Sequence, residues 1–267
     1  MGATLDKLDS KLDSKLDSKA ARQSIETDLL LGTADLPIRQ AVLKPFVQPE
    51  VVRLEIAPRE TRSEVSEQSR MLDELRHRHD LECPHCTSAR THTQTVFGEG
   101  NPNADIFFVG EAPGETEDRV GRPFVGRAGQ KLDEMIRSIG LRREDCYIAN
   151  VLKSRPPENR IPLPIEIQRC GPYLEQQLLI VNPKVIVTLG GPATKLLLKV
   201  ETGITKLRGI WAEWAPQAQS QRASIALMPT YHPAYLLRNY TLQTRQEVWS
   251  DLKAVAQFLA QSTSQSV

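Results

Sequence analysis

Residues 105–129 combine acidic residues with glycines directly after an apolar run. Residues 106–109 are typical of a buried strand, which ends at Gly110 in a turn rich in glycine, proline and acids. Such a turn places backbone N–H groups and the carboxylates of Glu111 and Glu117 at the carboxyl edge of a sheet, where open α/β folds bind ligands. Two interpretations remain for this segment alone: an ordinary strand-to-helix loop and a ligand-binding site.

The cysteines are a second group of residues with possible chemistry. The chain has four, and two of them form Cys83-Pro-His-Cys86. A Cys-x-x-Cys pair suits a metal site in a reducing compartment better than a disulfide framework. The first residues show no charged segment followed by an apolar one, and no run reaches 18 apolar residues. We therefore expect a soluble, cytoplasmic protein with no membrane partner.

Three further apolar segments, residues 146–152, 184–189 and 225–228, are predicted to be strands. Segments with helical periodicity alternate with them, which indicates an α/β domain with a mainly parallel sheet. Each predicted strand is followed by glycine, proline or polar residues. Because the carboxyl ends of parallel strands lie at one edge of a sheet, we expect these segments to meet in one site.

The first 65 residues are predicted to be a disordered or weakly helical extension before a folded domain at residues 66–262. They repeat Leu-Asp-Ser-Lys, so Leu8, Leu12 and Leu16 would form one thin stripe on a helix. Such a stripe buries too little apolar surface, and disorder or a transient helix is expected in preference to a coiled coil with a partner. Thr61 and Glu64 form a possible capping box where order begins.

Five segments in series resemble the iron–sulfur uracil-DNA glycosylases, the family-4 branch of their superfamily. They are Gly110-Glu-Ala-Pro-Gly114, Gly121-Arg-Pro-Phe-Val-Gly-Arg-Ala-Gly129, Tyr147-Ile-Ala-Asn-Val-Leu-Lys153, Arg155-Pro-Pro-Glu-Asn-Arg160 and His232-Pro-Ala-Tyr-Leu-Leu-Arg238. The resemblance implies a three-layer α/β/α sandwich around a central four-stranded, mainly parallel sheet. It also implies a monomeric DNA-repair enzyme that flips uracil out of DNA and hydrolyses its N-glycosidic bond, leaving an abasic site for base excision repair.

The resemblance assigns the bond cleavage to three side chains. Glu111 is the first candidate for positioning or activating water, and Glu117 is the second, because related enzymes carry an Asp at the position that is Ala112 here. His232 matches the histidine that donates to the uracil O2 as negative charge grows there. The alternatives are solvated loop acids and a structural histidine.

A second set of residues is expected to bind the base. Phe124 matches the aromatic residue that stacks on the flipped base, and Asn150 matches the residue whose amide pairs with the polar edge of uracil. Core packing is the alternative for Phe124, and a turn or cap is the alternative for Asn150. The remaining residues of the expected binding wall are Gly110, Ala112 and Gly114.

The DNA backbone is expected to contact a loop and a local basic rim. The overall charge gives no argument for nucleic-acid binding, since 34 Lys and Arg nearly balance 33 Asp and Glu. The loop is Tyr235, Leu236, Leu237 and Arg238, with a leucine as wedge in the minor groove and Arg238 near phosphate. The rim is Arg119, Arg122, Arg127, Lys153, Arg155 and Arg160. Two alternative functions remain: a catalytically silent DNA-binding module, and a glycosylase for another deaminated base.

The expected metal site departs from the family at one position. The resemblance places the four ligands of a structural 4Fe–4S cluster at Cys83, Cys86, Cys170 and position 154, which is Ser154 here. Cys146 lies eight residues upstream, about 26 Å along a strand, and is expected to be a buried strand residue. We therefore expect a bound but weaker cluster, with Ser154 or solvent at the fourth iron. A smaller cluster, no cluster and a zinc ion are the alternatives.

Overall fold

The structure, a computed structural model, describes residues 66–89, 92–216 and 224–264. The Leu-Asp-Ser-Lys repeat, the proposed extension and the possible capping box lie outside these residues. The helices are α2 (Glu67–Glu82), α3 (Glu115–Val120), α4 (Arg127–Ser138), α5 (Pro164–Val181), α6 (Gly191–Leu198), α7 (Ile204–Leu207), α8 (Pro233–Arg238) and α9 (Leu242–Ser264), with short 3-10 turns η1 (Arg143–Asp145) and η2 (Pro157–Asn159). Across this part of the chain, no helix is both long and apolar enough to span a bilayer.

The strands of the described residues form one sheet in the order β1-β3-β2-β4-β6-β5. The strands are β1 (Glu99–Gly100), β2 (Ile106–Gly110), β3 (Tyr147–Asn150), β4 (Val185–Leu189), β5 (Ala212–Trp214) and β6 (Ile225–Thr230). The inner four pair in parallel and confirm the predicted core of the sheet. β1 and β5 add antiparallel edges, so the expectation of four strands was too small. Two- and three-residue strands are too short for periodicity to reveal.

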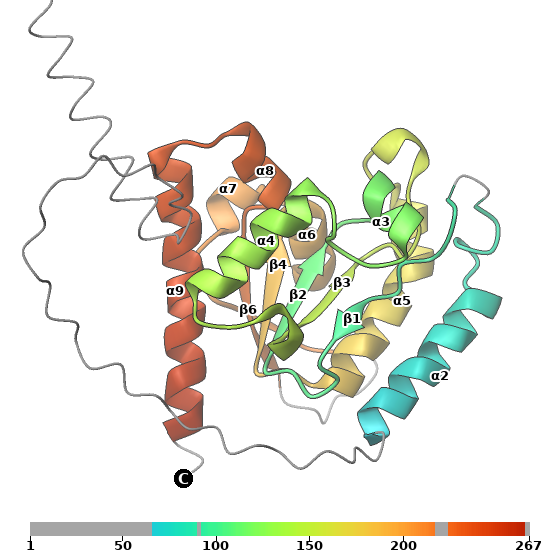
Figure 1. Ribbon diagram of the computed structural model, residues 1–267, viewed down its shortest axis with the longest axis horizontal. Coiled ribbons are helices and arrows are strands. Elements are labelled where there is room, and N and C mark those ends of the chain that lie inside the picture. Colours follow the sequence, from blue (N-terminus) through green and yellow to red (C-terminus); the bar gives the residue numbers. More distant parts are fainter. Residues whose placement is uncertain (1–65, 90–91, 217–223, 265–267) are drawn as a thin grey trace, which may run out of the picture.

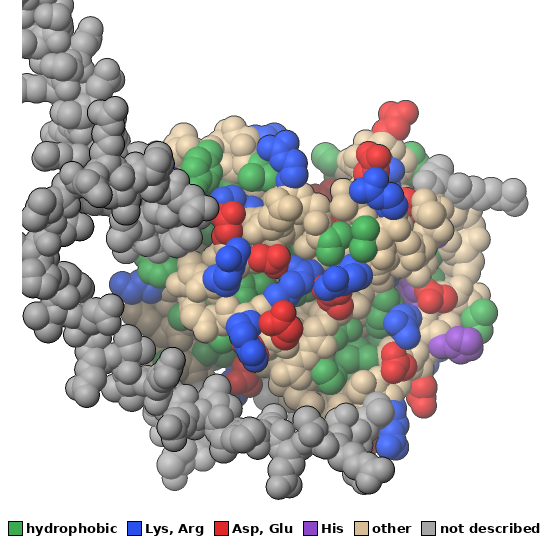
Figure 2. Space-filling model, viewed as in Figure 1, with side chains coloured by type: hydrophobic (Ala, Val, Ile, Leu, Met, Phe, Trp, Pro, Cys, Tyr) green, Lys and Arg blue, Asp and Glu red, His purple; other side chains and the backbone are tan. Residues whose placement is uncertain are grey.

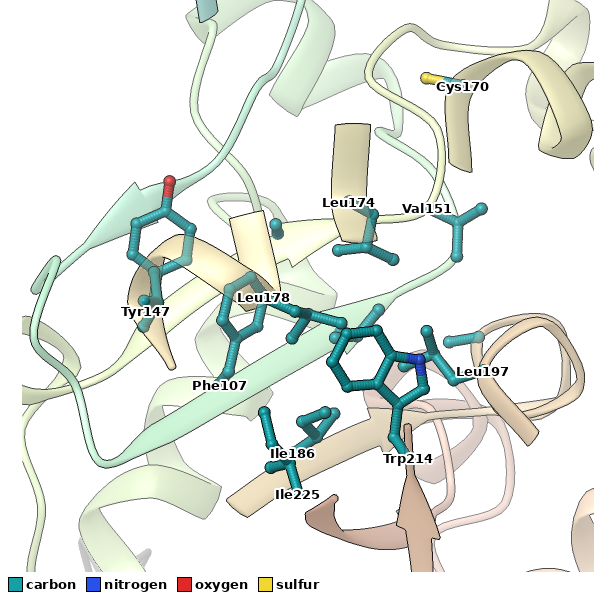
Figure 3. Packing of buried hydrophobic residues seen from close by; sticks show 14 of the residues in the cluster. Phe107, Tyr147, Val151, Cys170, Leu174, Leu178, Ile186, Leu197, Trp214 and Ile225 are labelled. Carbon is teal, nitrogen blue, oxygen red and sulfur yellow. The ribbon is translucent and has the colours of Figure 1, made fainter. Parts of the chain in front are cut away.

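Alternate residues of β2 enter two separate cores. Phe107 and Val109 pack on one face of the sheet with side chains of α5 and α6, and Ile106 and Phe108 pack on the other with side chains of α4 and α9. Figure 1 shows α9 and α5 on opposite sides of the sheet, and Figure 3 shows Phe107 beside Leu178 of α5. The fold is the predicted α/β/α sandwich.

α2 lies outside α5 and leads into the Cys-x-x-Cys pair (Figure 1). Ser66 caps it, because its Oγ accepts a hydrogen bond from the backbone N–H of Ser69 at 3.2 Å. Leu72 and Leu75 are the apolar residues of this helix that are buried. The helix ends at Cys83, so its packing determines where the first thiol lies.

The carboxyl ends of the parallel strands carry the segments that the sequence singled out. β2 ends at Gly110, β3 ends at Asn150, and β6 ends at Thr230, two residues before His232. In Figure 1, α3 and α8 lie at the end of the sheet to which the β2 arrow points. The predicted site residues therefore meet at this edge, as expected for an open α/β sheet.

Candidate functional site

A cavity of about 400 Å³ opens at this edge of the sheet. Segments after β2, β3 and β6 and the turn around η2 all contribute to its wall. The predicted site residues in the wall are Glu111, Ala112, Gly114, Glu117, Phe124, Asn150, His232 and Arg238. The sequence analysis did not assign the other wall residues to base binding; they are Pro113, Ala128, Pro156, Asn159, Arg160, Ile161 and Ala234.

Gly110 allows the cavity wall to close around the expected base position. It is the β-ladder partner of Asn150. A Cβ at Gly110 would lie 2.3 Å from Asn150 Oδ1 and 2.4 Å from Phe124 Cζ. Any side chain at this position would displace both residues, so Gly110 acts by bringing two other side chains together and does not itself line the cavity.

Asn150 has an unsatisfied polar atom at the cavity wall. The residue is 1% exposed, and its Oδ1 has no hydrogen-bond partner among the residues that the structure describes. An unpaired buried acceptor costs about 1–3 kcal/mol. A ligand with a matching donor would remove that cost, which is the physical basis for selective recognition of such a group.

Glu111 follows Gly110 and lines the cavity as a half-buried carboxylate. Its backbone carbonyl accepts a hydrogen bond from the N–H of Leu152 at 3.1 Å, which fixes the turn to the segment after β3. Burial raises the pKa of Glu111 above its usual value. A carboxylate with a raised pKa is a stronger base toward water.

Glu117 lies in the cavity wall but is already engaged with the backbone. Its Oε1 accepts hydrogen bonds from the N–H groups of Val125 at 2.9 Å and Gly126 at 2.8 Å. These bonds hold the loop in which Phe124 adopts a φ of +50°, a conformation that bulky residues rarely take. The geometry favours Glu117 as a positioning residue for Phe124.

Arg143 supports the same loop from η1 and was missed by the sequence analysis. Its guanidinium donates to the carbonyl oxygens of Pro123 at 2.5 Å and Phe124 at 3.1 Å. It also pairs with Glu99 of β1 at 2.7 Å and with Asp133 of α4 at 2.8 Å. No motif includes this residue, since its four partners come from three segments that only the fold brings together.

His232 joins the end of β6 to α8 with a defined tautomer. Its Nδ1 accepts a hydrogen bond from the N–H of Ala234 at 3.1 Å, so the proton of the neutral ring is on Nε2. Burial, followed by the charge of Arg238, lowers the pKa of His232 to about 4, although Glu117 opposes this shift. The ring is therefore neutral at pH 7 and offers one N–H donor. Phe124 lies beside it, with ring centroids 5.7 Å apart.

The predicted DNA loop corresponds to α8, and its four residues differ in exposure. Leu236 is 4% exposed and packs in the core with α4 and α9, so it is not placed to reach DNA. Tyr235 is half-buried against Tyr231. Leu237 is partly exposed, and Arg238 is exposed and lines the cavity. The structure thus leaves Leu237 as the leucine available for a wedge.

The expected basic rim is only partly present. Lys153 is fully buried, so its assignment to the rim was wrong. Arg155 is partly buried, with its Nε donating to Asn159 Oδ1 at 2.8 Å, and Arg122 pairs with Glu99 at 2.6 Å. Figure 2 shows basic and acidic side chains interspersed over α4 and its neighbours on the visible face. On this face, the mixed charges form no continuous basic surface.

The three predicted cysteine ligands meet on the opposite side of β3 from Cys146. Cys83, Cys86 and Cys170 are buried and unbridged, and Cys86 Sγ lies 3.9 Å from Cys170 Sγ. Ser154 is also buried, with its Oγ 3.3 Å from Cys86 Sγ. Cys146 lies in the other core, which confirms its predicted burial, but it directly precedes β3 and is not part of the strand. Figure 3 shows Cys170 on a helix, apart from the labelled aromatic side chains, and this helix is α5.

Lys153 links this cysteine centre to the cavity. Its backbone N–H donates to Cys170 Sγ at 3.2 Å, while its Nζ donates to the carbonyl oxygen of Asn150 at 2.7 Å and to Gln177 Oε1. The Gln177 amide in turn donates to the carbonyl of Phe97 at 3.0 Å. The backbone of this one buried residue therefore contacts the cysteine centre, and its side chain ties the end of β3 to α5.

Known proteins match the chain over this domain. Residues 97–253 match the family described as the uracil DNA glycosylase superfamily. The chain is 45% identical over 178 residues to a type-4 uracil-DNA glycosylase of Thermotoga maritima, an overlap of 66% of this chain and 89% of that protein. It is 44% identical over 181 residues to that of Archaeoglobus fulgidus, with 66% and 88% covered. For that of Sulfurisphaera tokodaii the identity is 46% over 168 residues, with 61% and 74% covered.

Proposed function

Because the chain belongs to the uracil DNA glycosylase superfamily, we propose that it removes uracil from DNA by hydrolysing the bond between C1′ of the sugar and N1 of the base. The observation that carries this proposal is the convergence of Glu111, Phe124, Asn150 and His232 at one cavity, from the ends of three strands. The product is an abasic site, the substrate of base excision repair. The cavity is too narrow for a duplex, so the base must leave the stack to enter it.

In the proposed reaction, Glu111 aligns a water molecule for attack on C1′. As the C1′–N1 bond breaks, its electron pair goes to uracil, and positive charge develops on the sugar. The Glu111 carboxylate favours that charge and accepts a proton from water as the hydroxyl joins C1′. His232 donates its Nε2–H to the uracil O2, where the negative charge grows. Uracil then takes up a proton and leaves as the neutral base.

Selection of uracil is assigned to Asn150 and Phe124. Phe124 supplies a face for stacking, worth roughly 1–3 kcal/mol per base. The Asn150 amide offers a donor and an acceptor, which pair with the O4 and N3–H of uracil and not with the amino group of cytosine. Ala112 and Gly114 keep the wall free of large side chains, and Gly110 lets Asn150 and Phe124 approach each other. Glu117 positions the Phe124 loop.

For DNA binding, we propose contacts from Arg155, Leu237, Arg238 and the exposed part of Tyr235, with Leu236 supporting α8 from within the core. A wedge from Leu237 would occupy the space left by the flipped nucleotide. The enzyme is proposed to act as a monomer in the cytoplasm. Free, closely spaced thiols at the cysteine centre support a reducing compartment.

The residues of the cysteine centre fit a metal group, which we propose to be a structural 4Fe–4S cluster held by Cys83, Cys86 and Cys170. Bond cleavage requires no electron transfer, so the cluster supplies no step of the reaction. The resemblance to the iron–sulfur branch supports this assignment. A single zinc ion is the competing occupant, because a tetrahedron with bonds of about 2.3 Å has edges near 3.8 Å, close to the separation of Cys86 and Cys170.

An excision assay tests the proposed function. Oligonucleotides with a single uracil, hypoxanthine or mismatched thymine are incubated with the protein and then cleaved in alkali at abasic sites. We expect cleavage of the uracil strand only. Cleavage of the hypoxanthine or thymine strand alone would support a different base specificity, and binding with no cleavage would support a silent DNA-binding module. Asn150→Asp is expected to lose the preference for uracil over cytosine.

A further inference from the structure

A fourth metal-binding side chain lies among the three thiols of the cysteine centre. One ring nitrogen of His79 and the Sγ atoms of Cys83, Cys86 and Cys170 all lie within 4.8 Å of one another. His79 is fully buried. Neither the Cys-x-x-Cys pair nor the family resemblance includes this residue. Four donors at such spacing are a complete ligand set for a structural metal.

The backbone of α2 fixes the position of His79. The residue lies in the last turn of the helix, four residues before Cys83, and residues with this spacing share one face. The N–H of Cys83 donates to the carbonyl oxygen of His79 at 2.9 Å, so the helical hydrogen bonds continue as far as the first thiol. The ring packs edge-on against Tyr173, with centroids 4.8 Å apart.

The two nitrogens of the His79 ring have different surroundings. Nδ1 lies 2.8 Å from Asp80 Oδ1, which also accepts a hydrogen bond from Thr95 Oγ1 at 2.8 Å. A carboxylate at Nδ1 places the ring proton there and leaves the lone pair on Nε2. Nε2 is buried with no hydrogen-bond partner in the described part of the chain. This is the carboxylate–histidine–metal arrangement of many metal sites, with the ligating nitrogen left open.

Ser154 and His85 are weaker alternatives for the fourth position. Ser154 Oγ already forms a hydrogen bond with Cys86 Sγ. A neutral hydroxyl is not among the usual protein ligands of zinc or of iron–sulfur clusters, whereas imidazole occurs in both. His85 lies between the two cysteines in sequence, but its Nδ1 is 4.0 Å from Glu166 Oε1 and the ring is outside the group of four.

We propose that Nε2 of His79 is the fourth protein ligand of the metal centre and replaces the cysteine that the family resemblance places at position 154. This inference rests on the metal site of the proposed function and not on the excision reaction. In this arrangement, His79 supplies the fourth ligand that Ser154 does not supply. Ser154 is then a hydrogen-bond partner of Cys86.

Metal retention in matched variants tests the proposal. The full chain is prepared anaerobically, iron, zinc and acid-labile sulfide are measured per chain, and the release of metal to a chelator is followed. We expect His79→Gln to release the metal at least about tenfold faster than the wild type. For Asp80→Asn, we expect a release rate about tenfold above that of the wild type. Ser154→Ala and His77→Gln, an exposed histidine on the same helix, should release it at the wild-type rate. His79→Cys should hold the metal, because a thiolate restores ligation.

Spectroscopy separates ligation from a hydrogen bond and from mere packing. For an iron–sulfur cluster, we expect the ⁵⁷Fe Mössbauer spectrum to show one iron distinct from the others in the wild type and in Ser154→Ala, and equivalent irons in His79→Cys. For zinc, X-ray absorption should show one light ligand beside three sulfurs in the wild type, and only sulfurs in His79→Cys. A His79→Gln variant that fails to fold leaves the His79→Cys result decisive.

Two outcomes would overturn the proposal, and they differ in whether the metal site itself also fails. A metal-loaded wild type whose spectrum changes in Ser154→Ala but not in His79→Cys would assign the fourth position to Ser154. A wild type that contains neither iron nor zinc would overturn the metal site and the ligand together. Uracil excision is measured separately and decides neither result.

Discussion

The short segment 150–154 joins the cavity to the cysteine centre, since Asn150 lines the cavity and Ser154 contacts Cys86. The two regions are nevertheless built in different ways. The cavity is lined by side chains near the ends of parallel strands. Two of them are fixed by hydrogen bonds to nearby backbone, Glu117 to Val125 and His232 to Ala234. The cysteine centre gathers side chains from the end of α2, the start of α5 and the segment after β3. Its donors face one another and not the solvent.

This difference explains why the family pattern is intact in one region and altered in the other. A cavity that must match a base has one position for each polar group, so a lost Asn150 or His232 has no substitute within reach. A closed metal site requires only the right number of donors around a point. His79 lies within 4.8 Å of the three thiols, and in our proposal it takes the place that Ser154 leaves.

Among changes that separate the two regions, the largest effect is expected from replacing His232, the proposed donor of the cavity. His232→Gln removes the Nε2–H that, in the proposed reaction, stabilises the developing charge on uracil O2. Such a donor is worth about 2.7–4 kcal/mol, so we expect a 10²–10³-fold fall in kcat. The metal content should stay at the wild-type value. Single-turnover excision of uracil, with metal analysis of the same sample, measures both. A fall in kcat of less than threefold would remove His232 from the reaction.

Replacing Lys153, which contacts both the cavity segment and the cysteine centre, is expected to lower the free energy of unfolding. Lys153→Met leaves the carbonyl of Asn150 and Gln177 Oε1 without their donor, and we expect a loss of about 2–4 kcal/mol in the free energy of unfolding. The exposed Lys184, paired with Asp105, is the control, and Lys184→Met should cost less than about 1 kcal/mol. Urea unfolding compares them. Equal stability of the two variants would show that Lys153 does not join the two regions.

A smaller effect is expected from the titration of His232. Its pKa is about 4 in the folded protein and about 6.5 when unfolded. The depressed pKa gives stability that is fully present above pH 6.5 and is lost as the pH falls towards 4, up to about 3 kcal/mol. Urea unfolding at pH 7 and pH 4.5 should therefore show a smaller pH-dependent loss in His232→Gln than in the wild type. Identical pH dependence in the two proteins would contradict the assigned neutral ring.

The sequence was sufficient to predict the inner strands and those cavity residues that follow a strand end or belong to a motif. The apolar runs predicted β2, β3, β4 and β6, and the residues after them predicted most of the cavity wall. The motifs did not reveal the burial of Lys153 or Leu236, since the direction of a side chain beyond a strand or within a short helix depends on tertiary packing. Arg143 was missed for a similar reason, because its four partners are distant in sequence.

The sequence contains a pattern that indicates His79 as a possible metal ligand, but the family resemblance assigns ligands only to the cysteine positions. The pattern His79-x-x-x-Cys83-x-x-Cys86 places a histidine one helical turn before the first thiol. From the sequence, Ser154 or solvent was expected at the fourth position, and the remaining thiol, Cys146, was excluded by its distance along the chain. Imidazole was not considered, although it is a common ligand of the same metals.

The central claim is that bond cleavage takes place in the cavity and depends on the carboxylate of Glu111. The most direct measurement is the single-turnover rate of uracil excision by the wild type, by Glu111→Gln and by Glu115→Gln, a control that alters an exposed acid of the same segment. We predict a loss of about 10²–10⁴-fold for Glu111→Gln and a rate within twofold of the wild type for Glu115→Gln. Full excision activity in a folded, metal-loaded Glu111→Gln variant would contradict the account.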